Sequence, residues 1–194
     1  MDAHLTRLFA LLGPASGPGA AAEDWQRMEA ELGVTLPADL KARTERYAPV
    51  RLNGSVHLSN PSTEANGLGP YICETVEAYR DCEFTEENFP GFAEQPAFGG
   101  PYGLIPVSGT PHGEHVFLHR GPGDGDWSVV VYAGADEEFH RYPMSFAEWL
   151  RRYLDGESVA GPGSAQVVPG PVRIEDLPTR PGAAASTERL GPPR

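Results

Sequence analysis

Apolar residues recur at intervals of three and four in the first 50 residues, which is the spacing of helices that bury one face. In the clearest case Trp25, Met28 and Leu32 lie on one stripe, Gly33 follows, and Asp24 stands where a helix cap is expected. We therefore predict three helices in this part of the chain, over residues 2–12, 24–32 and 37–47.

Beyond residue 50 the apolar pattern changes to alternation, which is typical of strands. Asn53-Gly54 is a strong hairpin signal and predicts two short strands within 50–58. Glycine, proline and aspartate residues separate four further alternating runs. These runs predict strands over residues 103–107, 114–120, 127–133 and 137–142. Both faces of 127–133 are largely apolar, so we expect this strand to be covered on both sides.

Two less regular segments lie between the hairpin and these strands. Residues 71–82 fit a helix, although many of them are polar. Residues 83–102 mix phenylalanine with glycine, proline and glutamate, which predicts an irregular loop that its aromatic side chains hold in place.

The last predicted helix has the clearest start in the chain. Ser145 and Glu148 form a capping box, in which each side chain satisfies a backbone N–H at the other end of the first turn. Gly156 ends this helix. Its wide apolar stripe consists of Phe146, Trp149, Leu150, Tyr153 and Leu154.

The chain divides into three parts by composition. Residues 1–22 hold an N-terminal helix and a Gly/Pro linker, and 23–157 form the folded domain. Residues 158–194 are rich in proline and glycine and poor in large apolar side chains. We expect this tail to be largely mobile, with a stretch around 167–177 able to dock.

The charge balance limits the kinds of partner. The 194 residues carry 15 Lys and Arg against 27 Asp and Glu, a formal net charge of −12. Proteins that bind nucleic acids or anionic membranes present basic surfaces, so we expect neither partner. Nor does any apolar run approach the roughly 20 residues of a membrane span. The acidity favours a basic partner.

The two cysteines and the start of the chain bear on the compartment. Cys73 and Cys82 are nine positions apart on a predicted helix, which is too far for a disulfide. The apolar start lacks the cationic segment of a signal peptide. We therefore expect a cytoplasmic protein.

Three histidines form an arrangement that superficially resembles a metal site. His112, His115 and His119 lie close in sequence, and a small metal-dependent hydrolase could use such a set. On a strand, however, His115 and His119 are separated by about 13 Å, so one ion would not reach both. Packed or solvent-facing histidines are the favoured interpretation, and a turn is favoured over a calcium site for 121–126.

Other catalytic patterns are missing from the sequence. It contains no Gly-x-Ser-x-Gly elbow and no phosphate-binding glycine loop with its lysine. We assign no catalytic, cofactor-binding or metal-binding residue, and we expect no enzymatic activity and no cofactor.

Carboxylates are concentrated in residues 74–94, where seven acidic residues accompany Arg80 alone. A solvated face that keeps the protein soluble is one interpretation. An electrostatic surface for a basic partner is the other, with Tyr79, Phe84 and Phe89 as aromatic anchors. The candidate partner-binding residues are Glu74, Glu77, Asp81, Glu83, Glu86 and Glu87.

An ordered series of residues within about 23–157 resembles the SUKH superfamily, which includes bacterial toxin-immunity proteins and fungal cell-wall regulators. The stretch 60–102 lies outside this likeness. The matching positions are Trp25, Glu29, Leu32-Gly33, Leu36-Pro37, Asp39, Gly103 to Val107, Gly113, Trp127 to Val130, Ser145-Phe146, Trp149-Leu150, Leu154 and Gly156.

The resemblance implies an α+β fold, with helices packed on a mostly antiparallel sheet of about five to six strands and no catalytic residues. The predicted order of elements agrees with this class. It also implies a protein that binds and neutralises a cognate bacterial toxin, perhaps a nuclease. A regulatory scaffold of the cell-wall-regulator type is the alternative.

Overall fold

The predicted helices and strands between residues 3 and 154 are all present. The computed structural model describes residues 3–111, 113–121, 126–162, 164, 168–184 and 187–193. Its helices are α1 (Ala3–Leu12), α2 (Ala22–Leu32), α3 (Ala38–Tyr47), α4 (Leu68–Arg80), α5 (Phe146–Leu154) and the short 3-10 helix η1 (Glu86–Asn88). Its strands are β1 (Val50–Leu52), β2 (Val56–Leu58), β3 (Ile105–Gly109), β4 (His115–Arg120), β5 (Trp127–Ala133), β6 (Glu138–Tyr142), β7 (Arg173–Asp176) and β8 (Thr187–Leu190).

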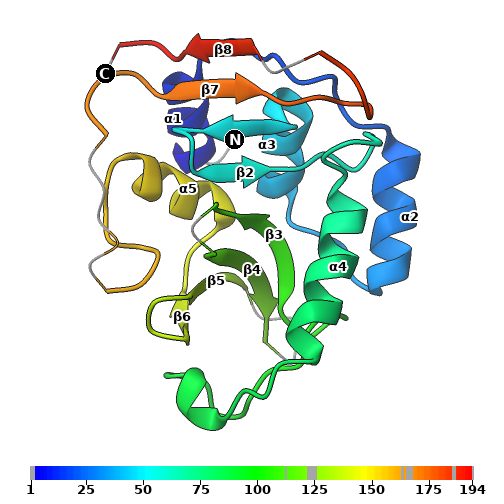
Figure 1. Ribbon diagram of the computed structural model, residues 1–194, viewed down its shortest axis with the longest axis vertical. Helices are drawn as coiled ribbons and strands as arrows, with labels where there is room; N and C mark the ends of the chain where they lie inside the picture. Colours follow the sequence, from blue (N-terminus) through cyan, green and yellow to red (C-terminus); the bar gives the residue numbers. More distant parts are fainter. Residues whose placement is uncertain are drawn as a thin grey trace.

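The strands form one antiparallel sheet in the order β6-β5-β4-β3-β2-β1-β7-β8 (Figure 1). Helices α1 and α3 both contact α5, and α5 packs on β5, while α4 packs on β3. The α+β class and the antiparallel sheet are therefore confirmed. No helix in the described part of the chain has the length and apolar character needed to cross a membrane.

Strand β5 shows why the sheet needs cover on two faces. Val129 and Val131 point to one side and Val130 to the other, and all three are fully buried, as the sequence predicted.

Strand β3 begins at Ile105, two residues later than predicted. The preceding Leu104 instead pairs with Phe98, so the end of the loop closes on itself before the strand starts.

The two predicted helix caps differ in outcome. Ser145 accepts a hydrogen bond from the backbone N–H of Glu148, as expected, but the Glu148 carboxylate lies 2.8 Å from Arg152. For α2 the predicted cap is wrong. Asp24 lies inside the first turn and pairs with Arg27, and the residue at the cap position is Ala21.

The joint between α3 and α5 contains a buried cation. The Arg43 guanidinium lies 4.8 Å from the centre of the Phe146 ring and is almost completely buried. Burial lowers the pKa of Arg43 to about 9, and the charge of Asp39 opposes this. Asp39 also accepts a hydrogen bond from the Ala147 N–H (2.8 Å), so one carboxylate both faces the cation and caps α5.

The sheet has more strands than the five to six expected, because the C-terminal segment contributes β7 and β8. Strand β7 pairs with β1, where Leu52 lies opposite Ile174. Ile174 is 0% exposed and Val172 is 1% exposed, so the few apolar residues of this segment cover the open edge of the sheet. Arg51 and Glu175 add an ion pair across the same junction.

This pairing predicts that Ile174 stabilises the whole domain. Ile174→Ala should lower the free energy of unfolding by about 2–4 kcal/mol, because truncating a buried aliphatic side chain loses its burial and leaves a cavity. Urea denaturation measures the change. The control is Leu190→Ala on β8, where the side chain is 61% exposed and the change should be small. Equal stability of the two variants would contradict the docking of β7.

Candidate functional site

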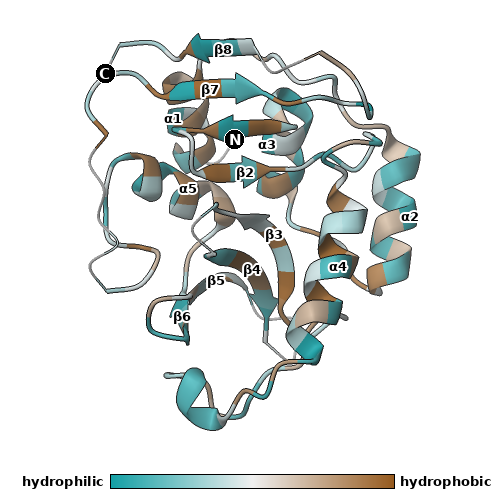
Figure 2. Ribbon diagram, in the orientation of Figure 1, coloured by the Kyte–Doolittle hydropathy of each residue, from teal (hydrophilic) through white to brown (hydrophobic). Residues whose placement is uncertain are grey.

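The six candidate carboxylates line the solvent side of α4 and the segment after it. Helix α4 turns Ile72, Val76 and Tyr79 toward the core, which leaves Glu74 and Glu77 on the opposite face. Figure 2 shows this division as alternating apolar and polar colours along α4, and η1 as polar. All six residues are exposed: Glu74, Glu77, Asp81, Glu83, Glu86 and Glu87. We call this set the acidic surface.

Specific hydrogen bonds hold the far end of the acidic surface. The Asn88 side-chain oxygen accepts from the Thr85 N–H (2.8 Å), and the Asn88 amide donates to the Glu137 carbonyl (2.8 Å) in the turn between β5 and β6. Since Glu86 and Glu87 form the first turn of η1, these contacts fix their backbone against the sheet.

The one basic residue within this stretch does not neutralise it. Arg80 donates two hydrogen bonds to the Phe98 carbonyl oxygen, at 3.1 and 2.9 Å. In the part of the chain that the structure describes, none of the six carboxylates forms an ion pair. Within the described residues, the acidic surface therefore presents six carboxylates without a direct ion-pair partner.

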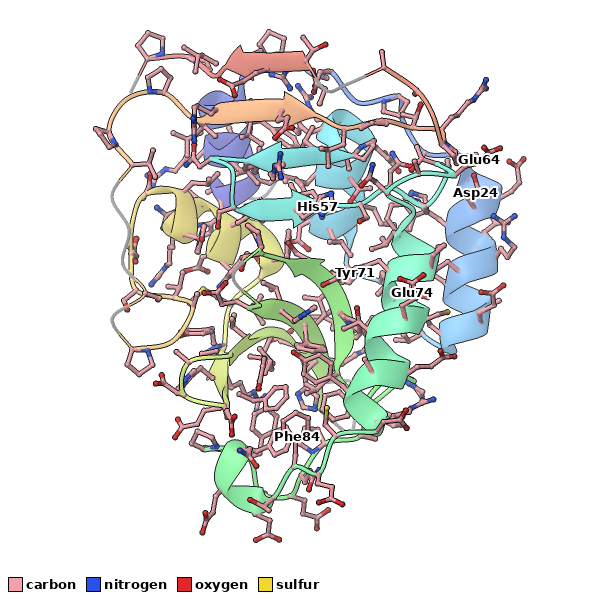
Figure 3. The ribbon with its side chains drawn as sticks, viewed as in Figure 1. Asp24, His57, Glu64, Tyr71, Glu74 and Phe84 are labelled. Atoms are coloured by element: carbon pink, nitrogen blue, oxygen red, sulfur yellow. The ribbon has the colours of Figure 1, made fainter. Side chains whose placement is uncertain are left out.

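The aromatic residues between these carboxylates have a different role from the one expected. Tyr79 and Phe89 are only 8% and 2% exposed, and Phe84 is half-buried, so they are not free anchors for a partner. Their rings pack on Phe117 and Phe139 of the sheet, at centroid distances between 4.4 and 5.9 Å. Figure 3 shows Phe84 in the lower part of the view, near the lower end of α4, the helix that also carries Glu74.

One exposed aromatic side chain of the described residues was not expected from the sequence. Tyr102 is 59% exposed, in the turn that the Gly99 N–H closes onto the Leu104 carbonyl (2.8 Å). The bonds from Arg80 to Phe98 place this turn beside the end of α4. No sequence signal separates Tyr102 from the buried rings of the same loop, because all of them stand among glycine, proline and acidic residues.

The histidines are packed among aromatic side chains. His115 Nδ1 lies 3.1 Å from the Tyr71 hydroxyl, and His119 packs edge-on against Phe92 with ring centres 5.5 Å apart. His112 lies outside the described residues, as do 122–125 of the predicted turn. In the described residues no three His, Cys, Asp or Glu side chains are grouped so that they could hold a metal ion. Cys73 and Cys82 are free and exposed.

Burial changes the titration of three histidines. It lowers the pKa of His57, His115 and His119 below the usual value. The charges of Arg51 and Arg141 further lower the pKa of His57 and His119, respectively, while Glu114 opposes the shift in the pKa of His115.

These shifts predict loss of stability on mild acidification. Below about pH 6.5 the unfolded chain binds more protons at these histidines than the folded chain does, so the free energy of unfolding falls as the pH drops. Urea midpoints at about pH 7.5 and 5.5, both above the range where carboxylates titrate, measure this. His119→Gln should reduce the pH dependence. A midpoint that rises on acidification would contradict the prediction.

Several residues that carry the family resemblance turn out to be structural. Glu29 accepts from the Leu36 N–H (2.7 Å) and so joins α2 to the turn before α3. The Trp149 indole donates to the Val159 carbonyl (2.7 Å), which fastens the chain after α5. These contacts join α2 to α3 and α5 to the segment that follows it.

The chain was compared with curated proteins and with protein-family models. No curated protein matches the chain. Residues 19–152 match the SMI1 / KNR4 family (SUKH-1), and this range contains α2, the acidic surface and the strands from β1 to β6. The match spans more than half of the chain, and the protein therefore belongs to the SMI1 / KNR4 family (SUKH-1).

Proposed function

We propose that this protein is a non-enzymatic immunity protein, which binds a basic bacterial toxin through the acidic surface and neutralises it in the cytoplasm. Membership of the SUKH-1 family supports a role in binding another protein. The observation that carries the proposal is the set of six exposed carboxylates without ion-pair partners in the described chain, carried by α4, η1 and the residues between them.

Electrostatics explains why such a surface suits a toxin. A nuclease binds phosphates through Arg and Lys, so its active site attracts any surface that presents carboxylates at similar spacing. Opposite charges also steer the two proteins together and raise the association rate by about 10- to 1000-fold at low salt. An immunity protein must capture its toxin quickly, and the acidic surface favours a fast encounter.

Complexes held by surface charge alone are weak. Tyr102 offers an aromatic contact that the carboxylates cannot provide. Surface ion pairs contribute little because water screens them, whereas aromatic side chains at the centre of an interface contribute much of the binding energy. Tyr102 is exposed in a turn whose Gly99 lies close to Val76 and Arg80 of α4, and a partner can bury it without any change in the core. We therefore place the edge of the binding surface at this residue.

The first test changes the sign of the charge on the acidic surface. Replacing Glu83, Glu86 and Glu87 with Lys should lower the association rate with the toxin encoded by the neighbouring gene by about tenfold or more at low salt. Stopped-flow or surface-based kinetics at several salt concentrations measure the rate.

A matched variant separates local from overall charge. Glu23, Glu45 and Glu188 are also exposed and form no ion pair among the described residues, and replacing them with Lys alters the net charge equally. This control should change the rate much less. Equal effects of the two triple variants would exclude the acidic surface as the docking site. Failure of the unmodified pair to bind, together with capture of a housekeeping partner in toxin-free cells, would instead support a regulatory scaffold.

The second test concerns Tyr102. Tyr102→Ala should weaken the complex by about tenfold or more, chiefly by speeding dissociation, because truncation removes an aromatic contact without changing the charge. Leu190→Ala is the control, since Leu190 is comparably exposed on β8. An unchanged dissociation rate for Tyr102→Ala would remove this residue from the interface.

A further inference from the structure

A small pocket lies where the β1–β2 hairpin, the first half of α4 and the end of β3 meet. Its volume is about 190 Å³. Figure 3 shows His57 on β2 and Tyr71 on the adjacent α4. The polar residues that line the pocket include Arg51, Ser55, His57, Tyr71, Thr110 and His115. None of the six residues of the acidic surface lines it.

The lining is rich in hydrogen-bond donors and contains no carboxylate. Two carboxylates bind residues of the lining, since Glu175 pairs with Arg51 and Glu114 is hydrogen-bonded to Thr110. In a protein with a net charge of −12, this concave wall combines one arginine with two histidines, and the charge of Arg51 is balanced by Glu175.

Each of the two imidazoles interacts with one side chain of the protein, Tyr71 for His115 and Asn66 for His57. The Tyr71 hydroxyl donates its proton to the Ser108 carbonyl (2.6 Å), so it can only accept from His115 Nδ1. For His57, the Asn66 side chain forms a hydrogen bond that favours the protonated ring. Yet Nε2 of His57 is buried without a hydrogen-bond partner among the described residues. A buried polar atom in this condition costs free energy that a ligand can recover.

We propose that this pocket binds a small oxyanion, a phosphate or carboxylate group, held by Arg51 together with the imidazoles of His57 and His115. The size agrees with this ligand, because pockets for larger organic molecules have volumes of about 300–1000 Å³. Ser55 adds a hydroxyl group to the same wall, where it lies 2.9 Å from the Tyr153 hydroxyl. This site lies apart from the acidic surface and does not depend on the proposed function.

Binding of an anion here is coupled to protonation. Burial disfavours the imidazolium form of His57, and so does the charge of Arg51, while Glu175 on β7 opposes them. His115 faces Tyr71 and Tyr79 of α4, and Glu114 precedes it. An oxyanion in the pocket adds negative charge beside both rings and stabilises their protonated forms.

Nuclear magnetic resonance of the full-length protein, labelled at histidine, tests the proposal. At about pH 6, near the ordinary pKa of histidine, inorganic phosphate is added at constant ionic strength, with acetate in a parallel titration and chloride as the reference. We expect the imidazole signals of His57 and His115 to move and saturate. His119 provides an internal control, because it is also buried but packs on Phe92 outside the pocket.

The two anions distinguish the possible sources of the ligand. Saturation by phosphate alone supports a phosphate group, and saturation by both anions or by acetate alone supports a site that accepts carboxylates. No saturation by either anion up to about 20 mM, or an equal shift at His119, would overturn the proposal.

A variant adds a second measurement. Arg51→Gln should weaken the binding of the anion by about tenfold or more, since a charge-assisted hydrogen bond is lost. Arg27→Gln is the matched control: it removes one positive charge from an exposed residue on α2 and should leave the affinity unchanged. Equal affinities of the two variants would show that the pocket does not hold the anion.

Discussion

Packing of Tyr79 on the aromatic face of the sheet is the contact on which the position of the acidic surface depends. Its ring lies between 5.2 and 5.9 Å from six other rings, those of Phe84, Phe98, His115, Phe117, Tyr132 and Phe139. Aromatic pairs of this kind contribute about 0.5–1.5 kcal/mol each beyond the area they bury. Residues 81–104 have few regular backbone hydrogen bonds, so these rings fix the path of the loop.

The same packing explains how a highly charged segment stays ordered. Seven carboxylates within 21 residues repel one another, and repulsion favours an expanded chain. The aromatic side chains oppose this expansion. The rings of Tyr79, Phe84 and Phe89 pack toward the core, while the carboxylates between them remain exposed to water. A partner that binds the acidic surface meets groups whose backbone is already in place, so less conformational entropy is lost on association.

Local patterns predicted most of the fold, because most elements are defined by short-range signals. Ser145 and the apolar stripe after it marked α5, and Asn53-Gly54 marked the hairpin. The roles of Tyr79 and Phe89 were not predictable in this way. Whether an aromatic residue among carboxylates is an exposed anchor or part of the core depends on contacts with Phe117 and Phe139, which lie far along the chain. The pocket was equally hidden, since its wall combines residues from three separate segments.

The C-terminal strands show how a segment outside the family match affects the matched domain. The match ends at residue 152, yet β1 lies inside the sheet only because β7 pairs with it. An open strand edge invites pairing with other chains, and β7 removes that possibility at β1. Glu175 of β7 also binds Arg51, which lines the oxyanion pocket. Arg51 is thus held in place by a strand that lies outside the residues matched to the family, so a segment beyond the match helps to shape this pocket.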